Sequence, residues 1–390
     1  MAPRQPNEER RLSWPTIFFI FGTTAGALLW PVYAYFYGVT GGEILLAVVY
    51  FVATAMSITV GYHRLIAHRS FACRSWVKAV FLIVGSAAWQ GSALEWASDH
   101  IRHHGYTDTG KDPYNIQQGF WYAHIGWLFW RREDDESDFP PHLAQDRLID
   151  LQHRYYLPLA IVTSFVVPFL IAGTGGLMLA GVVRIVLGHH VTWLVNSWAH
   201  VGGSRPYNPT VSATDNWMVA LFTFGEGWHN YHHTFPNDYR NGIGAFAWDP
   251  SKWLVWSMSK LGIAWDLKRI DSTVRWKKRV TSLLDYAEEQ DAISLERLRQ
   301  TKAGLERQIE ESRARAERLL RDSLQYEQAA HENMRELRER VGRYLSDKQE
   351  ALTESSRKRL ERACEALDSL DVYQRLLDRV ALAETRLTPA

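Results

Sequence analysis

The chain contains only two cysteines among its 390 residues, Cys73 and Cys364. Two thiols so far apart exclude a disulfide framework and a CxxC metal site, and they suit a reducing compartment. The sequence also has no HExxH motif, which argues against a metalloprotease. It has no cysteine motif that could hold an iron–sulfur cluster either.

A large net charge of either sign is missing as well, because 44 Lys and Arg side chains are balanced by 43 Asp and Glu. This balance gives no indication of a nucleic-acid partner. The mean hydropathy, -0.25, averages two unlike parts. Long apolar runs and all the tryptophans lie at or before Trp276, whereas the remainder is rich in Glu and Arg. A cleaved signal peptide is not expected, because the first apolar run is full length and no small-residue cleavage site follows it.

Four apolar segments are long enough to cross a bilayer, which takes about 17–25 residues. They are residues 14–37, 44–62, 156–172 and 177–198. Arg10 and Arg11 precede the first segment, which predicts that the N-terminal residues 1–13 are cytoplasmic. Because four crossings return the chain to its starting side, the C-terminus is expected in the cytoplasm too.

Three short motifs hold eight of the fifteen histidines. They are HRLIAH, HIRHH and HNYHH, which contain His63, His68, His100, His103, His104, His229, His232 and His233. In the second and third motifs, spacings of three and four residues place the imidazoles on one helical face. His63 and His68 are five residues apart, about 140° around a regular α-helix, so one of them must lie where the helix ends or bends.

A ninth imidazole, His200, follows Asn196 by four residues, so Asn196 points the same way and is a candidate to hold a water. Nine nitrogens exceed what one metal can bind, and two metals with four or five nitrogens each is the natural division. Zinc is usually satisfied by four ligands, so the surplus favours iron with an open position for oxygen. His189 and His190 lie inside the last apolar segment and are expected to be structural rather than ligands.

Residues 76–94 form a fifth apolar stretch. If this stretch crossed the membrane, the first two histidine motifs would lie on opposite sides, and one metal site could not use both. We therefore predict an in-plane or re-entrant helix there, which Lys78 and the small polar residues 90–92 also favour.

Longer stretches around these motifs carry a resemblance to a known family: HRLIAHRSF, EWASDHIRHHGYTDTGKDPYN, NSWAH and GEGWHNYHHTFPNDYRNG. Over residues 14–271 the chain resembles the membrane stearoyl-CoA (acyl-CoA delta-9) desaturases. The resemblance implies an all-α integral membrane protein, in which four transmembrane helices lie beneath a cytosolic helical cap with a di-iron site. It implies that the nine histidines bind two iron ions, that Asn196 holds a water, and that residues 14–275 form the desaturase domain.

The implied reaction uses O2 and two electrons to insert a cis double bond into a saturated acyl chain. Gln90, Trp96 and Thr192 match the bend of the family's acyl tunnel, and Phe51 and Ala55 match its closed end. All five are also ordinary choices for core packing.

Arg131 and Arg132 match a basic pair that meets the phosphates of the thioester carrier. Positive charge near a span end also has a purely topological explanation. Ser98 departs from the pattern, because animal acyl-CoA enzymes carry an arginine there that helps bind the carrier. An acyl-lipid or acyl-carrier-protein substrate therefore stays open beside acyl-CoA. No HPGG-type haem motif is present, so the electron donor is expected to be a separate protein, a cytochrome b5 or a ferredoxin with its reductase.

Residues 276–390 lie outside the resemblance. They contain no proline between residues 283 and 386, and apolar residues from Leu298 to Leu345 recur at spacings of three, four and seven. This pattern predicts a long amphipathic helix or coiled coil with a charged, solvated face. Homo-oligomerisation through this segment is one use that the pattern allows.

Two other functions remain open from the sequence. A related membrane hydroxylase would share the histidine motifs but return oxygen to the carbon, although the flanks GEGWHNYHH and NSWAH favour desaturation. A membrane metal-binding or transport protein would place its histidines within the spans, whereas most of these lie just beyond the span ends.

Overall fold

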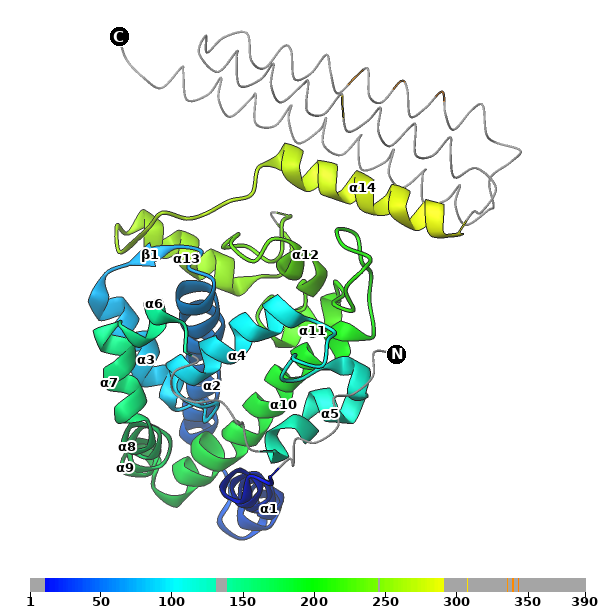
Figure 1. The fold of residues 1–390 in the computed structure, drawn as a ribbon. Coiled ribbons are helices and arrows are strands. Elements are labelled where there is room, and N and C mark those ends of the chain that lie inside the picture. The colour runs from blue at the N-terminus through cyan, green and yellow to red at the C-terminus, as the bar shows by residue number, and fades with distance from the viewer. Residues whose placement is uncertain are drawn as a thin grey trace, which may run out of the picture. The chain divides into compact units, whose positions relative to one another are not determined.

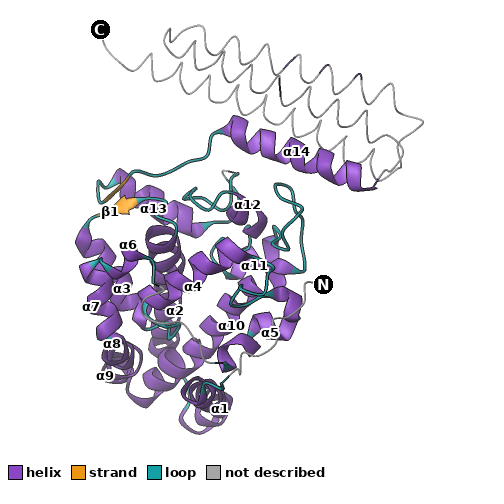
Figure 2. Cartoon of the chain, viewed as in Figure 1, coloured by secondary structure: helices purple, strands orange, loops and turns teal. Residues whose placement is uncertain are grey.

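The computed structural model describes residues 11–130, 139–244 and 246–290, together with the single residues Arg307, Arg335, Glu339 and Arg343. The described residues are mostly helical, which confirms the predicted helical class (Figure 2). The one sheet among them consists of two short antiparallel strands, β1 (Ala72–Cys73) and β2 (Ala264–Trp265), in which Ala72 lies opposite Trp265.

Two compact units divide the chain, Met1–Ile270 and Asp271–Ala390. In the second unit the structure describes the helix α14 (Ser272–Gln290) and the four single residues. The coiled coil predicted within residues 276–390 therefore lies, beyond Gln290, outside the described residues.

Three helical runs of the first unit are long and apolar enough to cross a membrane, Trp14–Tyr37, Gly41–Ala67 and Tyr156–His200. The first is α1 (Trp14–Tyr37), and the second joins α2 (Gly41–Met56) to the π-helix η1 (Ser57–Ala67). The third run is built from six consecutive elements: α8 (Tyr156–Ile161), η5 (Val162–Val166), α9 (Val167–Gly176), η6 (Leu177–Val183), α10 (Arg184–Asn196) and η7 (Trp198–His200).

The third run turns back on itself. Ala172 and Gly173 have non-helical backbone angles, with φ of -138° and 57°. Beyond them the chain returns beside its own path, because a Cβ added at Gly181 would lie 2.8 Å from the carbonyl oxygen of Ser164. A glycine at position 181 permits this close approach. The run is therefore a helical hairpin with two packed arms.

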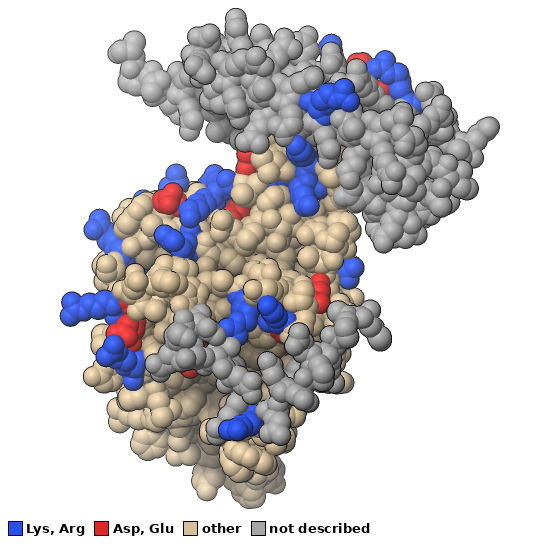
Figure 3. Space-filling model, in the orientation of Figure 1, with Lys and Arg blue, Asp and Glu red and all other residues tan. Residues whose placement is uncertain are grey.

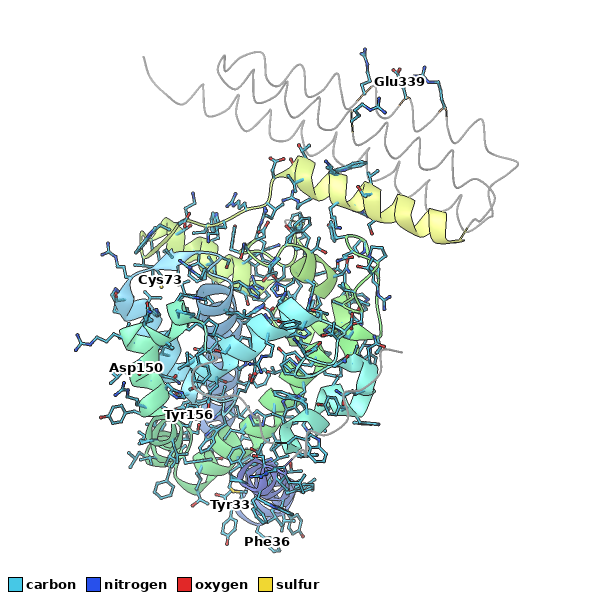
Figure 4. All side chains as sticks on the ribbon, in the orientation of Figure 1. Tyr33, Phe36, Cys73, Asp150, Tyr156 and Glu339 are labelled. Carbon is cyan, nitrogen blue, oxygen red and sulfur yellow. The ribbon has the colours of Figure 1, made fainter. Side chains whose placement is uncertain are left out.

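The apolar surface of α1 is largely bare of protein contacts. Only Ile20 is buried in this helix, while Phe18, Leu28 and Phe36 are 70%, 73% and 71% exposed. Figure 4 shows Phe36 pointing away from the rest of the unit. The end of the unit formed by α1, α8 and α9 (Figure 1) carries almost no charged side chain in the view of Figure 3. Such a surface suits lipid rather than water, as expected for a membrane protein.

The second run begins three residues before the predicted segment 44–62. Thr40 Oγ1 accepts a hydrogen bond from the backbone N–H of Glu43 at 3.2 Å, and Glu43 Oε2 accepts one from the N–H of Thr40 at 2.8 Å. This reciprocal capping box starts the helix at Gly41.

The helix predicted over residues 76–94 is too long. The observed helix α3 (Ser75–Ser86) ends eight residues earlier, because Trp89 and Gly91 have φ of 55° and 89°, which a right-handed helix cannot contain. Ser92 is already the N-cap of the next helix, α4 (Ala93–Tyr106). The 12 residues of α3 extend about 18 Å, too short to cross a hydrocarbon layer of about 30 Å.

The remaining described helices follow in short pieces: η2 (Ile116–Gln118), α5 (Phe120–His124), η3 (Gly126–Phe129), α6 (Pro141–Ala144), α7 (Arg147–Arg154), α11 (Trp217–Phe222), α12 (His229–Thr234) and α13 (Pro250–Lys260). Two buried apolar clusters hold the unit together, and η1 contributes to both. Tyr62 packs with Leu94 and Ile149 in one, and Val60 packs with Val255 in the other. The helix that carries His63 is therefore fixed on two sides.

Candidate metal centre

Four parts of the first unit bring the nine predicted histidines together. They are η1 with the residue after its end, α4, η7 and α12, which supply His63, His68, His100, His103, His104, His200, His229, His232 and His233. Within this set the histidines of HIRHH and HNYHH lie on helices, as their spacing predicts.

The imidazoles form two groups, in each of which the ring nitrogens lie within 4.8 Å of one another. The group of five contains His63, His68, His100, His104 and His232, and the group of four contains His103, His200, His229 and His233.

The shortest separations in both groups join Nε2 atoms. In the group of five, Nε2 of His68 lies 2.7 Å from Nε2 of His100, and Nε2 of His232 lies 2.9 Å from those of His63 and His104. In the group of four, Nε2 of His233 lies 3.1 Å from those of His103 and His229.

This convergence fits a shared metal ion in each group. Two nitrogens bound at right angles, each about 2.1 Å from a metal, are about 3.0 Å apart. The observed separations run from 2.7 Å to 3.1 Å. Imidazole is a suitable ligand for iron as well as for zinc and copper, so the donor set alone admits each of these metals.

Burial keeps most of these rings neutral. It lowers the pKa of seven of them well below the ordinary histidine value, and neighbouring imidazoles lower it further: His68, His100, His103, His104, His229, His232 and His233. A neutral imidazole has one nitrogen with a free lone pair, which is the form that binds a metal.

A π-helix resolves the five-residue spacing of the first motif. The backbone N–H of His68 donates to the carbonyl of His63 at 3.0 Å, the i to i+5 bond of a π-helix. Residues five apart then lie near one face, and the ring centroids of His63 and His68 are 4.8 Å apart. His68 follows the last helical residue, Ala67, which agrees with the expectation that one of the pair lies where the helix ends.

A buried carboxylate, Glu226, orients one of the rings from outside the group. Its Oε2 lies 2.9 Å from Nδ1 of His63, which leaves Nε2 to face the group. Arg64 donates from Nη2 to Oε1 at 3.0 Å, and Asn241 donates to Oε2 at 2.8 Å. Burial opposes ionisation of the carboxyl, but His63 and Arg64 hold the pKa of Glu226 well below its ordinary value. Such a carboxylate fixes the tautomer and raises the basicity of a ligating ring.

The group of four has comparable outer contacts. Nδ1 of His103 lies 2.9 Å from Oδ1 of Asp112, and burial raises the pKa of this carboxyl to about 7. Nδ1 of His200 lies 2.6 Å from the hydroxyl of Ser212, whose backbone N–H donates to Asp108 at 2.7 Å. Each group therefore has at least one ring with a fixed outer partner.

A cavity of about 800 Å³ reaches both groups, since His63, His100, His103 and His229 form part of its wall. Apolar and aromatic side chains make up most of the remaining wall, a composition typical of sites for apolar ligands.

Four of the predicted tunnel residues line this cavity, Ala55, Gln90, Trp96 and Thr192. Gln90 donates from Nε2 to the hydroxyl of Thr192 at 2.9 Å, and Trp96 donates from Nε1 to Oε1 of Gln90 at 3.2 Å. The ring of Trp96 stacks on His100 with centroids 5.0 Å apart. The three bend residues thus form one chain of contacts beside the group of five.

The other predicted residues are placed differently. Phe51 is not part of the cavity wall. The centroid of its ring lies 6.1 Å from the ring centroid of Phe224, and Phe224 lines the cavity. Asn196 lines the cavity. Arg131 and Arg132 lie outside the described residues.

Ser98, His189 and His190 are not among the clustered histidines, although His189 lines the cavity. Ser98 is buried and donates to the carbonyl of Leu94 at 2.7 Å, so its hydroxyl is used within α4. His189 and His190 belong to neither histidine group. His190 instead lies 3.1 Å from His124.

The sequence did not predict the roles of three charged residues that contact the histidines or their partners: Glu226, Asp112 and Arg64. Glu226 and Asp112 stand inside the motif flanks GEGWHNYHH and GKDPYN, and Arg64 directly follows His63. A charged residue beside a histidine motif is a usable signal for an outer contact, but which ring it meets depends on the fold.

Comparison with known proteins places these motifs in context. Residues 43–249 match the family model described as fatty acid desaturase. A probable acyl-CoA desaturase of Schizosaccharomyces pombe is 40% identical over 270 residues, which cover 66% of this chain and 55% of that protein. Acyl-CoA desaturase 1 of Saccharomyces cerevisiae is 40% identical over 237 residues, or 58% of this chain and 46% of that protein.

A bacterial relative is matched over nearly its whole length. The sn-1 stearoyl-lipid 9-desaturase of Anabaena variabilis is 34% identical over 264 residues, which cover 67% of this chain and 96% of that protein. By contrast, the matched part of the chain spans about half the length of the two yeast relatives.

Proposed function

The chain belongs to the fatty acid desaturase family, and on that premise we propose that it inserts a cis double bond, at the delta-9 position, into a saturated acyl chain. The observation that carries the proposal is the pair of histidine groups at the wall of one largely apolar cavity. The relatives named above are acyl-CoA and stearoyl-lipid desaturases, which supports the same reaction.

Iron is the metal of this proposal, with one ion in each histidine group and Asn196 holding a water. The total of nine imidazoles exceeds what two tetrahedral zinc ions take, and imidazole suits iron. The chemistry that bound iron supplies is activation of O2 and removal of one hydrogen from each of two adjacent methylenes, with oxygen leaving as water.

The protein's own contribution is to position the acyl chain and exclude water. A chain that lies against Trp96 lies beside His100, on which Trp96 stacks. Gln90 and Thr192 fix the neighbouring wall through their hydrogen bond. In this proposal Ala55, which lines the cavity, and Phe51 lie at the closed end that receives the tail of the acyl chain.

The substrate of this proposal is an acyl thioester, with acyl-CoA preferred and Arg131 and Arg132 meeting the carrier's phosphates. The serine at position 98 keeps an acyl-carrier protein or an acyl-lipid as the alternative. A separate protein, a cytochrome b5 or a ferredoxin with its reductase, donates the electrons, and the C-terminal segment is a candidate for homo-oligomerisation.

Four transmembrane helices complete the proposal, with both termini and the metal centre on the cytoplasmic side. Two observations support it: the third apolar run folds into a hairpin at Ala172 and Gly173, and Arg10 and Arg11 precede the first run.

Expression in a host that lacks delta-9 unsaturated fatty acids tests the function. We expect delta-9 monounsaturated acyl chains with the wild type and none with His232→Ala, which removes a member of the group of five. An unchanged lipid profile with iron-loaded wild-type protein and a working electron donor would overturn the proposal.

A further inference from the structure

Two ionisable side chains, Arg184 and His189, lie buried in the second arm of the apolar hairpin, where they are 3% and 5% exposed. Ionisable residues at such depth are costly and usually have a function in the protein interior. Neither belongs to the histidine groups.

Both side chains bind carbonyl groups at the end of α3. Arg184 donates from Nη1 to the carbonyl of Ala87 at 2.5 Å, and Nε2 of His189 lies 2.9 Å and 3.0 Å from the carbonyls of Ala88 and Trp89. Carbonyls at a helix C-terminus lack partners within the helix and attract positive charge. Inside a membrane they must be satisfied by protein, so α10 caps α3 from a separate element.

Ser164, on the first arm of the hairpin, strengthens the same cap. Its hydroxyl donates to the carbonyl of Ala87 at 3.0 Å and accepts from Nε1 of Trp89 at 2.9 Å. Both arms of the hairpin therefore form hydrogen bonds with the residues that follow α3.

The segment that follows α3, residues 87–91, has an unfavourable backbone conformation at Trp89. Trp89 has a φ of 55°, a region that bulky residues rarely occupy and that persists only when surrounding contacts impose it. The contacts with Arg184, His189 and Ser164 are well placed to impose it.

The same segment forms a wall of the cavity at the metal centre. Trp89, Gln90 and Gly91 all line the cavity. Gln90 accepts from Trp96, and Trp96 stacks on His100. A shift of the segment would therefore move the wall beside the group of five.

We propose that Arg184 and His189 are positioning residues that set where along the acyl chain the double bond forms, by holding residues 89–91 in place. This inference rests on the proposed desaturase function. When the cap is lost, the wall relaxes and neighbouring methylenes also come within reach of the metal centre.

The test compares the products of purified, iron-loaded variants supplied with stearoyl-CoA and an electron donor. We expect Arg184→Met and His189→Phe to raise the share of double bonds formed away from the principal position at least threefold, as read by mass spectrometry of derivatised products. Arg184→Lys and His189→Gln, which keep a donor, should restore most of the wild-type pattern. His190→Phe is the control, because His190 faces His124 and not the cavity, and it should leave the pattern unchanged. Since His189 itself lines the cavity and Arg184 does not, the Arg184 variants separate loss of the cap from a direct change of the wall.

A milder variant and a second readout keep the test decisive if a large substitution prevents folding. Ser164→Ala should shift the products in the same direction by a smaller amount. Hydrogen–deuterium exchange of the peptide that contains residues 87–96 should be faster in the Arg184 and His189 variants than in His190→Phe, whether or not the protein is active.

Folded variants that exchange at the wild-type rate, or that place every double bond at the wild-type position while merely working more slowly, would overturn the inference. If the wild type itself forms no double bond, the desaturase function fails, and the exchange measurement alone decides whether the cap holds the segment.

Discussion

At the scale of single residues, a buried network of charged side chains lies behind the imidazole of His63. Glu226 joins His63 to Arg64, and Arg64 in turn pairs with Asp249 at 3.0 Å. All four side chains are buried. Buried charges are tolerated when they are paired and fully hydrogen-bonded, so this network holds the His63 ring in place without leaving a charge alone.

Glu226→Gln tests this role. Glutamine keeps the size of the side chain but removes the charge that faces Nδ1 of His63, and loss of such an outer partner typically lowers metal affinity roughly 10–100-fold. We expect the variant to lose iron at a lower chelator concentration than the wild type, in a titration followed by metal analysis.

Glu43→Gln is the control for this titration, since Glu43 caps α2 and belongs to neither histidine group. Equal retention of iron by Glu226→Gln and the wild type would show that the carboxylate does not support the metal centre.

At the scale of elements, α7 is held at its start by Asp146. The carboxylate accepts from the backbone N–H groups of Leu148 and Ile149 at 3.1 Å and 3.2 Å and pairs with Lys78 of α3. Burial opposes ionisation, but Lys78 and these N–H groups outweigh it and hold the pKa of Asp146 below its ordinary value.

A depressed carboxyl pKa stabilises the fold above the unfolded-state pKa of about 3.9, and the contribution disappears as the pH falls through the lower folded-state value. Asp146→Asn keeps a good N-cap but removes the charge. We expect the wild type to melt at a higher temperature than the variant near neutral pH, and the difference to shrink as the pH falls below about 3.9 and through the lower folded-state pKa.

Thermal melts across this pH range check the prediction. Asp150→Asn, on the same helix, serves as the control, because Asp150 pairs with the exposed Arg154 and such surface pairs contribute little to stability. A constant difference between wild type and Asp146→Asn at every pH would show that the charge of Asp146 is not what stabilises the fold.

The helical class and the shared helical face of the histidine motifs could be predicted from the sequence, because both depend on the spacing of residues close together in the chain. The shared helical face in HIRHH follows from positions three and four apart, and the apolar run at Trp14–Tyr37 follows from length and composition. The end of α3 could not be predicted in this way. Trp89 lies just beyond α3 and has a positive φ. The carbonyl groups of this segment accept hydrogen bonds from Arg184 and His189, which lie far along the chain.

The contacts of Glu226 could not be predicted from the sequence either, because they join residues far apart in the chain. Its position in GEGWHNYHH is plain in the sequence, but its partners His63 and Arg64 come from η1. The π-helical winding that brings His63 and His68 to one face was also unpredicted, since the spacing indicated only that a regular helix could not run through both.

At the scale of the whole molecule, the cavity reaches from the apolar helices to the two histidine groups, and in the proposed function its closed end should set the length of the acyl chain. Ala55 lines the cavity, so Ala55→Tyr adds a ring where the chain end is expected to lie. We expect the ratio of palmitoyl-CoA to stearoyl-CoA turnover to rise roughly tenfold, the scale at which apolar pockets discriminate chain length.

Val49→Tyr provides the comparison for Ala55→Tyr, since Val49 lies on the same helix, is 52% exposed and is not part of the cavity wall. An unchanged ratio in a folded Ala55→Tyr protein would place the end of the acyl chain elsewhere.

The central claim is that the two histidine groups hold the metal that removes hydrogen from an acyl chain, and the mass of the product tests it most directly. Purified protein loaded with iron is supplied with stearoyl-CoA, O2 and an electron donor, and the acyl product is weighed by mass spectrometry. The desaturase account predicts a product lighter by two hydrogens, and no product from His232→Ala. A product heavier by one oxygen, or metal uptake with no lipid product at all, would contradict it.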